Sequence, residues 1–343
     1  MKKKTAVVIC PGRGVYNKTE LGYLTRYHAN RAGMFAGFDR QRAEMGQETL
    51  SALDGAAAFA MSTHTRGDNA SALIFAASLA DFMAIDRTRI EIAAVTGNSM
   101  GWYSALACGG ALAPDNGFRV ANTMGTLMQQ SLIGGQLIYP FVGEDWTSDP
   151  ARKAELLALV NKAGASLSID LGGMLVVAGD KPSLEVFEKS VPPVQERFPM
   201  RLANHAAFHT RLQAPVAEAG QSRLPVSLFE QPKVPLIDGR GAIWWPGATD
   251  PGRLRDYTLG HQVTETYDFT RAVQVAAREF APDLFIVTGP GTTLGGAVAQ
   301  SLILGTWRGL SSKADFQAAQ KDSPLLAAMG MEEQRALVVG SSS

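Results

Sequence analysis

The stretch Gly97-Asn98-Ser99-Met100-Gly101 follows a short apolar segment, residues 90–95, and precedes a helical pattern. A Gly-x-Ser-x-Gly sequence between a strand and a helix is typical of a nucleophile elbow, because the small flanking residues let the backbone bend tightly and expose the hydroxyl. The helix start behind the serine would also offer free backbone N–H groups to a developing oxyanion. Ser99 is therefore a candidate nucleophile, and the alternative is a structural serine in a glycine-rich turn.

A serine nucleophile needs a base, and the chain has five histidines. His205 and His209 share the segment ANHAAFHTRL, whereas a surface or core role is the simpler interpretation of His28 and His64. Two histidines four residues apart could also bind a metal, but no matching carboxylate or cysteine cluster accompanies them. We therefore expect no metal site, and the residues alone leave the choice of base open.

The composition excludes several classes of protein. Among 343 residues, 46% are hydrophobic, so a substantial core can form, and Lys+Arg and Asp+Glu both total 32. This balance gives no general attraction to nucleic acid or to an anionic membrane. Two cysteines cannot form a disulfide framework. The apolar run near the start is too short for a signal peptide, and no segment reaches the length of a membrane span. We expect a soluble cytoplasmic protein.

The elements that must position these residues alternate along the chain. An apolar strand is followed more than once by a glycine turn and a helix, which predicts an α/β sheet with helices packed on it. The expected strands are residues 5–10, 90–97, 234–239 and the start of 283–300; the expected helices are 69–85, 101–108 and 114–130.

The pattern changes character over residues 134–201. A strand-like segment, an amphipathic helix at 149–164, two strands joined at Gly172-Gly173, and a helical segment on both sides of Pro192-Pro193 follow one another. This alternation predicts a small β/α subdomain inserted into a discontinuous core formed by residues 1–133 and 202–312. Residues 313–343 are expected to form a polar C-terminal tail with one helix.

The segment GNSMGWYSALACGGALAPDNGFRVANTMGTLMQQS resembles the malonyl-CoA:acyl-carrier-protein transacylases and the acyltransferase domains of polyketide synthases, which carry GHSxGE-YSAL-AAG-L and then a helix ending in RG-LMQ. Four more segments resemble motifs of that family in the same order, from about residue 5 to about residue 304: ICPGRGVY, AAFHTRL, TETYDFTRAV and IVTGPGTTLGGAV. The resemblance implies a hydrolase-like α/β core with an inserted ferredoxin-like subdomain at about 134–201.

The resemblance also implies roles for single residues. Ser99 would be the acyl-accepting nucleophile and His209, not His205, its base. Backbone N–H groups of Met100 and Arg13 would form the oxyanion hole. The family orients its histidine with a main-chain carbonyl at the position of Asp268, where this sequence has a carboxylate. Asp268 could therefore orient His209 through its side chain, giving a Ser-His-Asp arrangement, or through its carbonyl alone.

Four positions depart from the family pattern. Asn98 stands where the family has histidine, Trp102 where it has glutamate, and Arg13 where it has glutamine. Met124 stands where the family has the arginine that pairs with the malonyl carboxylate. An unpaired carboxylate beside Met124 would cost on the order of several kcal/mol. We therefore predict an uncharged acyl group, with Asn98, Met124, Trp102 and Phe208 forming its binding site. Alternatively, Arg13 reaches in from the opposite wall and restores a carboxylate clamp, or faces the carrier protein or a CoA phosphate.

The function implied is acyl transfer between CoA and acyl-carrier-protein thioesters through an acyl-Ser99 intermediate. The phosphopantetheine thioester is then substrate, and no other cofactor is expected. The expected partners are acyl-CoA and acyl carrier protein, with no nucleic acid and no membrane, and the protein is expected to be a monomer. Two alternatives share the fold: an acyl-thioester hydrolase, and a weakly active subunit that binds carrier proteins. The presence of both Ser99 and His209 argues against the last.

Overall fold

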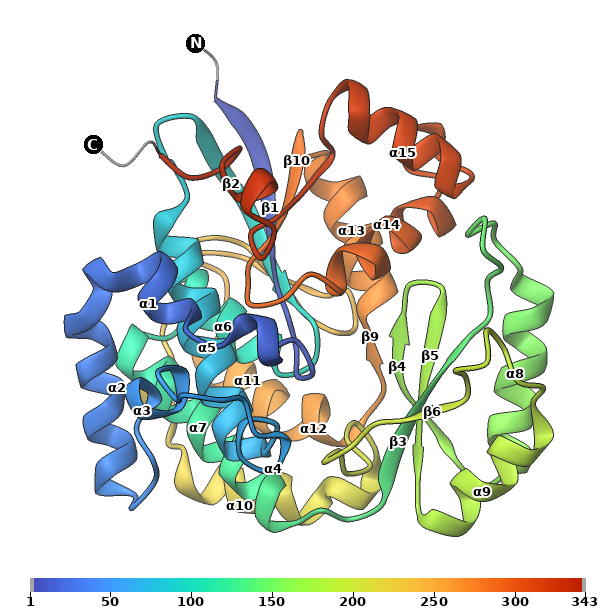
Figure 1. Cartoon of the computed structure of the whole chain (residues 1–343), viewed down its shortest axis with the longest axis horizontal. Coiled ribbons are helices and arrows are strands. Elements are labelled where there is room, and N and C mark those ends of the chain that lie inside the picture. Colours follow the sequence, from blue (N-terminus) through green and yellow to red (C-terminus); the bar gives the residue numbers. More distant parts are fainter. Residues whose placement is uncertain (1–2, 341–343) are drawn as a thin grey trace.

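The computed structural model describes residues 3–340 and consists of two sheets with helices around them (Figure 1). The larger sheet has six strands in the order β11-β10-β1-β2-β7-β8, and all neighbours are parallel except β7 and β8. Its central strand β1 is buried from Ala6 to Cys10, which explains the continuous apolar run in the sequence. The strands are β1 (Lys4–Cys10), β2 (Ile90–Gly97), β7 (Leu236–Ile237), β8 (Ile243–Trp244), β10 (Leu284–Val287) and β11 (Leu326–Ala328).

Helices cover this sheet and bring the site residues to its edge. Helix α5 (Gly67–Ala84) is buried over most of its length, and it packs closely on α7 (Pro114–Gln130). A Cβ atom on Gly125 would lie 2.7 Å from the Gly67 carbonyl oxygen, so the two helices can approach only because these residues are small. Helix α6 (Gly101–Cys108) follows β2, and α13 (Phe269–Phe280) and α14 (Leu294–Leu304) flank β10.

Further helices belong to the core. They are α1 (Tyr23–His28), α2 (Ala32–Glu44), α3 (Leu50–Asp54), α4 (Met61–His64), α10 (Ala214–Arg223), α11 (Pro251–Asp256), a π-helix (Tyr257–His261) and α12 (Gln262–Thr264). No helix in the described part of the chain is both long and apolar enough to cross a membrane.

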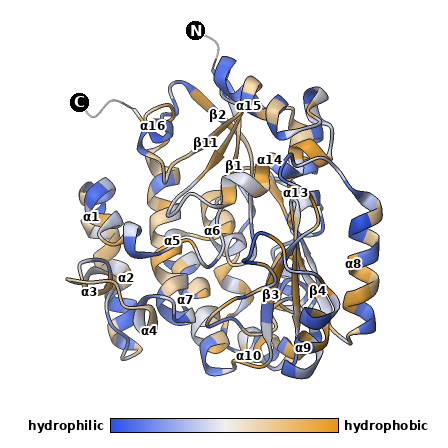
Figure 2. Ribbon diagram, turned by 45° about the vertical axis from the view of Figure 1, so that its right-hand side comes forward, coloured by the Kyte–Doolittle hydropathy of each residue, from blue (hydrophilic) through white to orange (hydrophobic). Residues whose placement is uncertain are grey.

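Residues 135–201 form a ferredoxin-like subdomain with its own core. The order of its elements is β3 (Gly135–Pro140), α8 (Pro150–Lys162), β4 (Ser166–Leu171), β5 (Met174–Gly179), α9 (Lys181–Ser190) and β6 (Met200–Arg201). The second sheet runs β6-β3-β5-β4, and β9 (Tyr267–Asp268) adds to β4 in parallel, which ties the subdomain to the core. Leu137, Leu156 and Phe187 are fully buried between this sheet and its two helices. Figure 2 shows hydrophobic colouring along β1 and β2 and mixed colouring on the outer helix α8.

The expected helix on both sides of Pro192-Pro193 is wrong for its second half. Helix α9 ends at Ser190, Val191 is extended, and Val194 pairs with Phe198 in an isolated bridge. Two successive prolines cannot donate backbone hydrogen bonds, and the first forces the residue before it out of the helical region.

The expected C-terminal tail is also wrong, because residues 313–340 belong to the core. Helix α15 (Lys313–Asp322) leads into β11, which pairs with β10, and α16 (Glu332–Arg335) follows. Arg335 is buried, and its Nη1 donates to Asp81 Oδ1 at 2.7 Å. A strand as short as β11 has no periodicity by which a sequence could reveal it.

Candidate active site

Ser99 lies on the sharp turn between β2 and α6, with a positive φ of 54°. A Cβ on Gly97 would lie 2.2 Å from the Gly101 carbonyl oxygen, and one on Gly101 would lie 2.1 Å from the Cys10 carbonyl oxygen. No side chain fits at either position. The two glycines of the sequence pattern are therefore required by the close approach of the backbone, and the strained turn presents the Ser99 hydroxyl.

His209 is the histidine that meets this hydroxyl. Ser99 Oγ lies 2.7 Å from His209 Nε2, and His209 Nδ1 lies 2.6 Å from the main-chain carbonyl oxygen of Gln262. Since a carbonyl can only accept, Nδ1 carries the proton and Nε2 is left to accept from the serine. Burial lowers the pKa of His209 to about 4, so its imidazole is neutral at neutral pH. This pair can transfer the hydroxyl proton to the ring.

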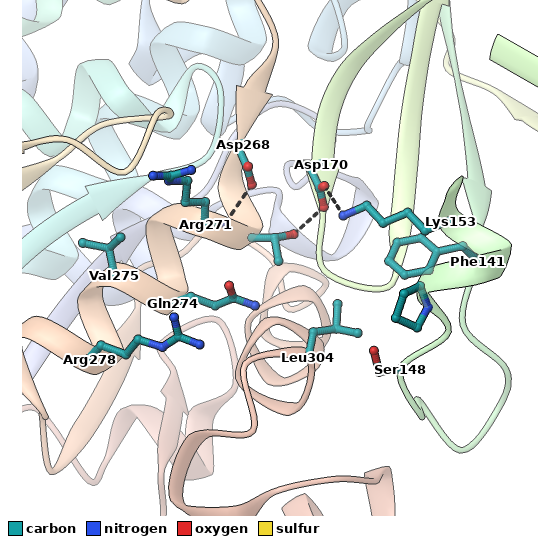
Figure 3. A pocket seen from close by; sticks show the side chains of 12 residues that line it. Phe141, Ser148, Lys153, Asp170, Asp268, Arg271, Gln274, Val275, Arg278 and Leu304 are labelled. Atoms are coloured by element: carbon teal, nitrogen blue, oxygen red, sulfur yellow. Dashed lines mark hydrogen bonds and ion pairs between the residues drawn. The ribbon is translucent and has the colours of Figure 1, made fainter. Parts of the chain in front are cut away.

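Gln262 takes the orienting role that the sequence gives to Asp268, so that prediction is wrong. The Asp268 carboxylate accepts from the Arg271 N–H at 2.8 Å and caps helix α13. Asp268 lines a separate cavity of about 560 Å³. Figure 3 shows its side chain near Asp170, which is paired with Lys153. Burial raises the pKa of Asp268. The carbonyl that orients His209 comes earlier in the chain, directly after the π-helix.

The side chain of Gln262 reinforces the same arrangement. Its Nε2 donates to the Ser99 carbonyl oxygen at 3.1 Å, and its Oε1 accepts from the Tyr103 hydroxyl at 3.3 Å. One residue therefore holds the nucleophile turn with its side chain and the base with its carbonyl. Sequence reasoning missed Gln262, because a role carried by the main chain leaves no signature in residue type.

Two backbone N–H groups are free near the nucleophile. Within residues 3–340, the N–H groups of Met100 and Arg13 make no intramolecular hydrogen bond. A Cβ on Gly12 would lie 2.7 Å from the Asn98 carbonyl oxygen, so the loop that carries Arg13 rests against the Ser99 turn. These N–H groups are the donors that the sequence predicts for an oxyanion hole.

Ser99 opens into a cavity of about 430 Å³ between the core and the subdomain. Asn98, Arg13 and Phe208 are on its wall, and Asn98 Oδ1 is enclosed there without a hydrogen-bond partner in the described chain. Most of the remaining wall is apolar: Val15, Ile138, Ile169, Leu171, Met174, Val176, Phe198, Met200, Leu202, Leu294 and Ala297.

Met124 and Trp102 do not lie on this wall, and the prediction that they line the acyl site is wrong. Both are fully buried. Met124 packs on α10, where a Cβ on Gly220 would lie 2.6 Å from its Sδ atom. Trp102 Nε1 donates to Thr258 Oγ1 at 3.0 Å within the π-helix. Helix α10 and the π-helix fill the space that these side chains were expected to border.

The Arg13 guanidinium extends along the cavity wall beside Phe208, with its Cζ 5.4 Å from the ring centroid. Its Nη2 donates to the carbonyl oxygens of Thr65 and Asn204 at 3.0 and 2.9 Å. Its Nε and Nη1 atoms are enclosed and have no acceptor in residues 3–340. Burial lowers the pKa of Arg13 to about 10, which still leaves it protonated at neutral pH.

His205 lies on the same wall, and its Nδ1 is 2.8 Å from Gln136 Oε1. Burial, and after it the charge of Arg13, lower the pKa of His205 well below its usual value. The other histidine of the pair, His209, is committed to Ser99 and Gln262. Among the residues that the structure describes, no group of three or more His, Cys, Asp or Glu could hold a metal ion.

The known proteins that are similar to the chain in sequence include a malonyl CoA-acyl carrier protein transacylase and a polyketide synthase. No family model matches the chain. It is 25% identical over 230 residues to the malonyl CoA-acyl carrier protein transacylase of Salmonella typhimurium, which covers 66% of the chain and 72% of that enzyme. It is 28% identical over 182 residues to a non-reducing polyketide synthase of Aspergillus novofumigatus, covering 51% of the chain and 8% of the synthase.

Solved structures match over almost the whole chain. The malonyl-CoA:ACP transacylase of Synechocystis superposes with a TM-score of 0.73 at 16% identity, covering 98% of this chain and 100% of that one. A malonyl-transacylase in complex with a type II polyketide synthase acyl-carrier protein superposes with a TM-score of 0.73 at 18% identity, covering 98% and 99%. The chain thus has the fold of the malonyl-CoA:acyl carrier protein transacylases, an α/β hydrolase-like core with a ferredoxin-like subdomain, and is related to these enzymes in sequence.

Proposed function

We propose that the protein is an acyltransferase that moves an acyl group between thioesters of CoA and acyl carrier protein through an acyl-Ser99 intermediate. One observation carries the proposal: Ser99 Oγ is 2.7 Å from His209 Nε2, while the Gln262 carbonyl fixes the other ring nitrogen. A serine hydroxyl that lies beside an oriented, neutral base can act as a nucleophile. The relatedness to transacylases supports the choice of thioesters as substrates.

The first half of the reaction acylates the enzyme. Ser99 Oγ attacks the thioester carbonyl carbon as His209 Nε2 takes the hydroxyl proton. The N–H groups of Met100 and Arg13 stabilise the negative charge on the carbonyl oxygen. The carbon–sulfur bond then breaks, and the departing thiolate takes the proton from His209.

The second half transfers the acyl group. A second phosphopantetheine thiol gives its proton to His209 and attacks the acyl-serine carbon. The bond to Ser99 Oγ breaks, and the proton returns to the serine. Acyl carrier protein as the second partner is supported by the carrier-protein complex of a protein with the same fold. Ser99, His209 and main-chain groups supply every proton transfer and charge contact in these steps.

The acyl group in this proposal is uncharged. Met124 provides no cation and packs away from the cavity. Most of the cavity wall is apolar, and His205 is neutral there. Burying a malonyl carboxylate against such a wall costs free energy unless a cation meets it. The guanidinium of Arg13 lies on this wall, but its Nη2 is bonded to two carbonyl oxygens and its Nε and Nη1 are enclosed.

Intact-mass analysis tests the proposal. The protein is incubated with malonyl-, acetyl-, butyryl- and octanoyl-CoA, and a mass increase equal to one acyl group is expected with the uncharged thioesters. Ser99→Ala should abolish the adduct. Holo acyl carrier protein should then discharge the adduct faster than buffer does. Discharge at the same rate in buffer indicates a hydrolase instead, and the absence of an adduct with every thioester would contradict the proposal.

A further inference from the structure

One part of the cavity wall is polar, unlike the rest. Arg13, His205 and Gln136 gather there beside Phe208, whose ring centroid is 5.8 Å from that of His205. Neither catalysis at Ser99 nor the oxyanion hole uses the side chains of these residues. We call Arg13 and His205 the polar pair.

The hydrogen bonds behind His205 fix its tautomer. Ser168 Oγ is 2.8 Å from the Phe208 carbonyl oxygen, so the hydroxyl must donate there. Ser168 Oγ therefore accepts from Gln136 Nε2, at 2.6 Å, and Gln136 Oε1 is left to face His205 Nδ1. Nδ1 must then carry the proton.

The other ring nitrogen of His205 is consequently an acceptor. Because burial and the nearby Arg13 charge keep the ring neutral, Nε2 holds a lone pair. Within the described part of the chain, no donor bonds to this Nε2. Arg13 contributes a positive charge, and its Nε–H and Nη1–H are enclosed without an acceptor in residues 3–340. The polar pair thus offers an unused acceptor on the cavity wall, beside an enclosed cation.

We propose that the polar pair recognises a hydroxyl group on the acyl chain, so that hydroxyacyl thioesters are the preferred donors. The hydroxyl hydrogen is donated to His205 Nε2, and the hydroxyl oxygen lies toward the positive charge of Arg13. This inference rests on the proposed function and narrows its substrate class. A carboxylate fits less well, because it can only accept and would meet the lone pair of His205.

Discrimination by such a site follows from the cost of leaving it unfilled. An acyl chain without the hydroxyl covers the His205 acceptor and leaves it unpaired, and sites built to bind a hydroxyl reject such analogues strongly. We expect a hydroxyacyl thioester to acylate Ser99 at least about tenfold faster than its unsubstituted counterpart.

Matched thioesters test this inference. Rates of Ser99 acylation are measured by intact mass with butyryl-, 2-hydroxybutyryl-, 3-hydroxybutyryl- and malonyl-CoA. One hydroxybutyryl isomer should react fastest, and its hydroxyl position reports the reach from Ser99 to the polar pair. In His205→Phe, which keeps an aromatic ring but loses the acceptor, the ratio of the hydroxybutyryl rate to the butyryl rate should fall toward one.

A second variant acts without removing the histidine. Ser168→Ala frees the Gln136 amide to turn over and reverse the tautomer of His205, so the same ratio should fall several-fold. Arg197→Gln serves as the matched control, because Arg197 is an exposed arginine on the same cavity and is not part of the polar pair. Its rate ratio should equal that of the unmodified protein.

Three outcomes would overturn the inference. Equal rates for butyryl and both hydroxybutyryl thioesters would show that no hydroxyl is recognised. A malonyl rate above all others would assign Arg13 to a carboxylate. If His205→Phe slows the acylation of Ser99 equally with every thioester, the polar pair instead contacts the pantetheine arm, which has amide groups. Labelling of Ser99 by none of the thioesters would instead refute the proposed function itself.

Discussion

At the scale of the residue, the proposed chemistry depends on His209, which is neutral because it is buried. Its Nδ1 donates to the Gln262 carbonyl, and that bond raises the pKa of His209 less than burial lowers it. A neutral ring accepts the serine proton, whereas a protonated ring cannot. The proposed mechanism therefore links the protonation of His209 to the rate of acylation.

This linkage predicts the pH dependence of acylation. Below the pKa of His209 the ring is protonated and Ser99 is inactive; above it the ring is free to accept. The rate constant for acylation under limiting acyl-CoA should rise through a midpoint near pH 4 and stay level to neutral pH. Quenched-flow intact mass from pH 3 to 8 measures it. A midpoint near 6.5, the usual histidine value, would contradict the buried, neutral base.

Residue identity predicts some of these partners and not others. Ser99 and His209 are visible in the sequence because their side chains carry the chemistry. Gln262 is not, since its carbonyl does the orienting. Asp268 misled because the resemblance places the orienting carbonyl at its position, where a carboxylate suggests a Ser-His-Asp arrangement. The cap that Asp268 forms on α13 uses the same residue type for a different purpose.

At the scale of the element, the turn between β2 and α6 was predictable because the strand and the helix on either side of it have clear patterns. Its two glycines are required by the close approach of the backbone. A Cβ atom added at Gly101 would lie 2.1 Å from the Cys10 carbonyl oxygen. The backbone of helix α6 and that of strand β1 cannot yield as a flexible side chain can. The turn and the central strand β1 therefore depend on one another.

Gly101→Ala should consequently unfold more easily and lose acylation. We expect a loss of unfolding free energy of about 1–3 kcal/mol or more from overpacking, together with an acylation rate reduced by at least about a hundredfold, because the displaced turn moves Ser99 from His209. Gly296→Ala is the control, since nothing lies within 4 Å of its added Cβ on helix α14, and alanine there should raise stability by about 1 kcal/mol. Urea unfolding measures the stability of each variant, and intact mass measures its acylation rate. Equal stability of the two variants would disprove the steric argument.

At the scale of the whole molecule, packing decides which residues reach the site. Met124 lies on the helix that the family uses for its arginine, yet α10 covers it, and no local sequence pattern reports which helix packs on which. The same holds for residues 313–340, whose polar composition suggests a tail. Their strand β11 completes one edge of the larger sheet, and Arg335 reaches a buried charge network on α5.

That network predicts how the C-terminal segment contributes to stability. Asp81 is fully buried and accepts from Arg335 Nη1 and the Gly289 N–H, and it lies 2.7 Å from His28 Nε2. Arg335→Met leaves this carboxylate without its permanent cation, so the free energy of unfolding should fall by about 3–5 kcal/mol. Arg335→Met combined with Asp81→Asn removes both charges and should recover part of the loss, because the two substitutions are coupled. Urea unfolding of the three variants gives the coupling energy. Strict additivity would mean that the ion pair between Arg335 and Asp81 contributes nothing to stability.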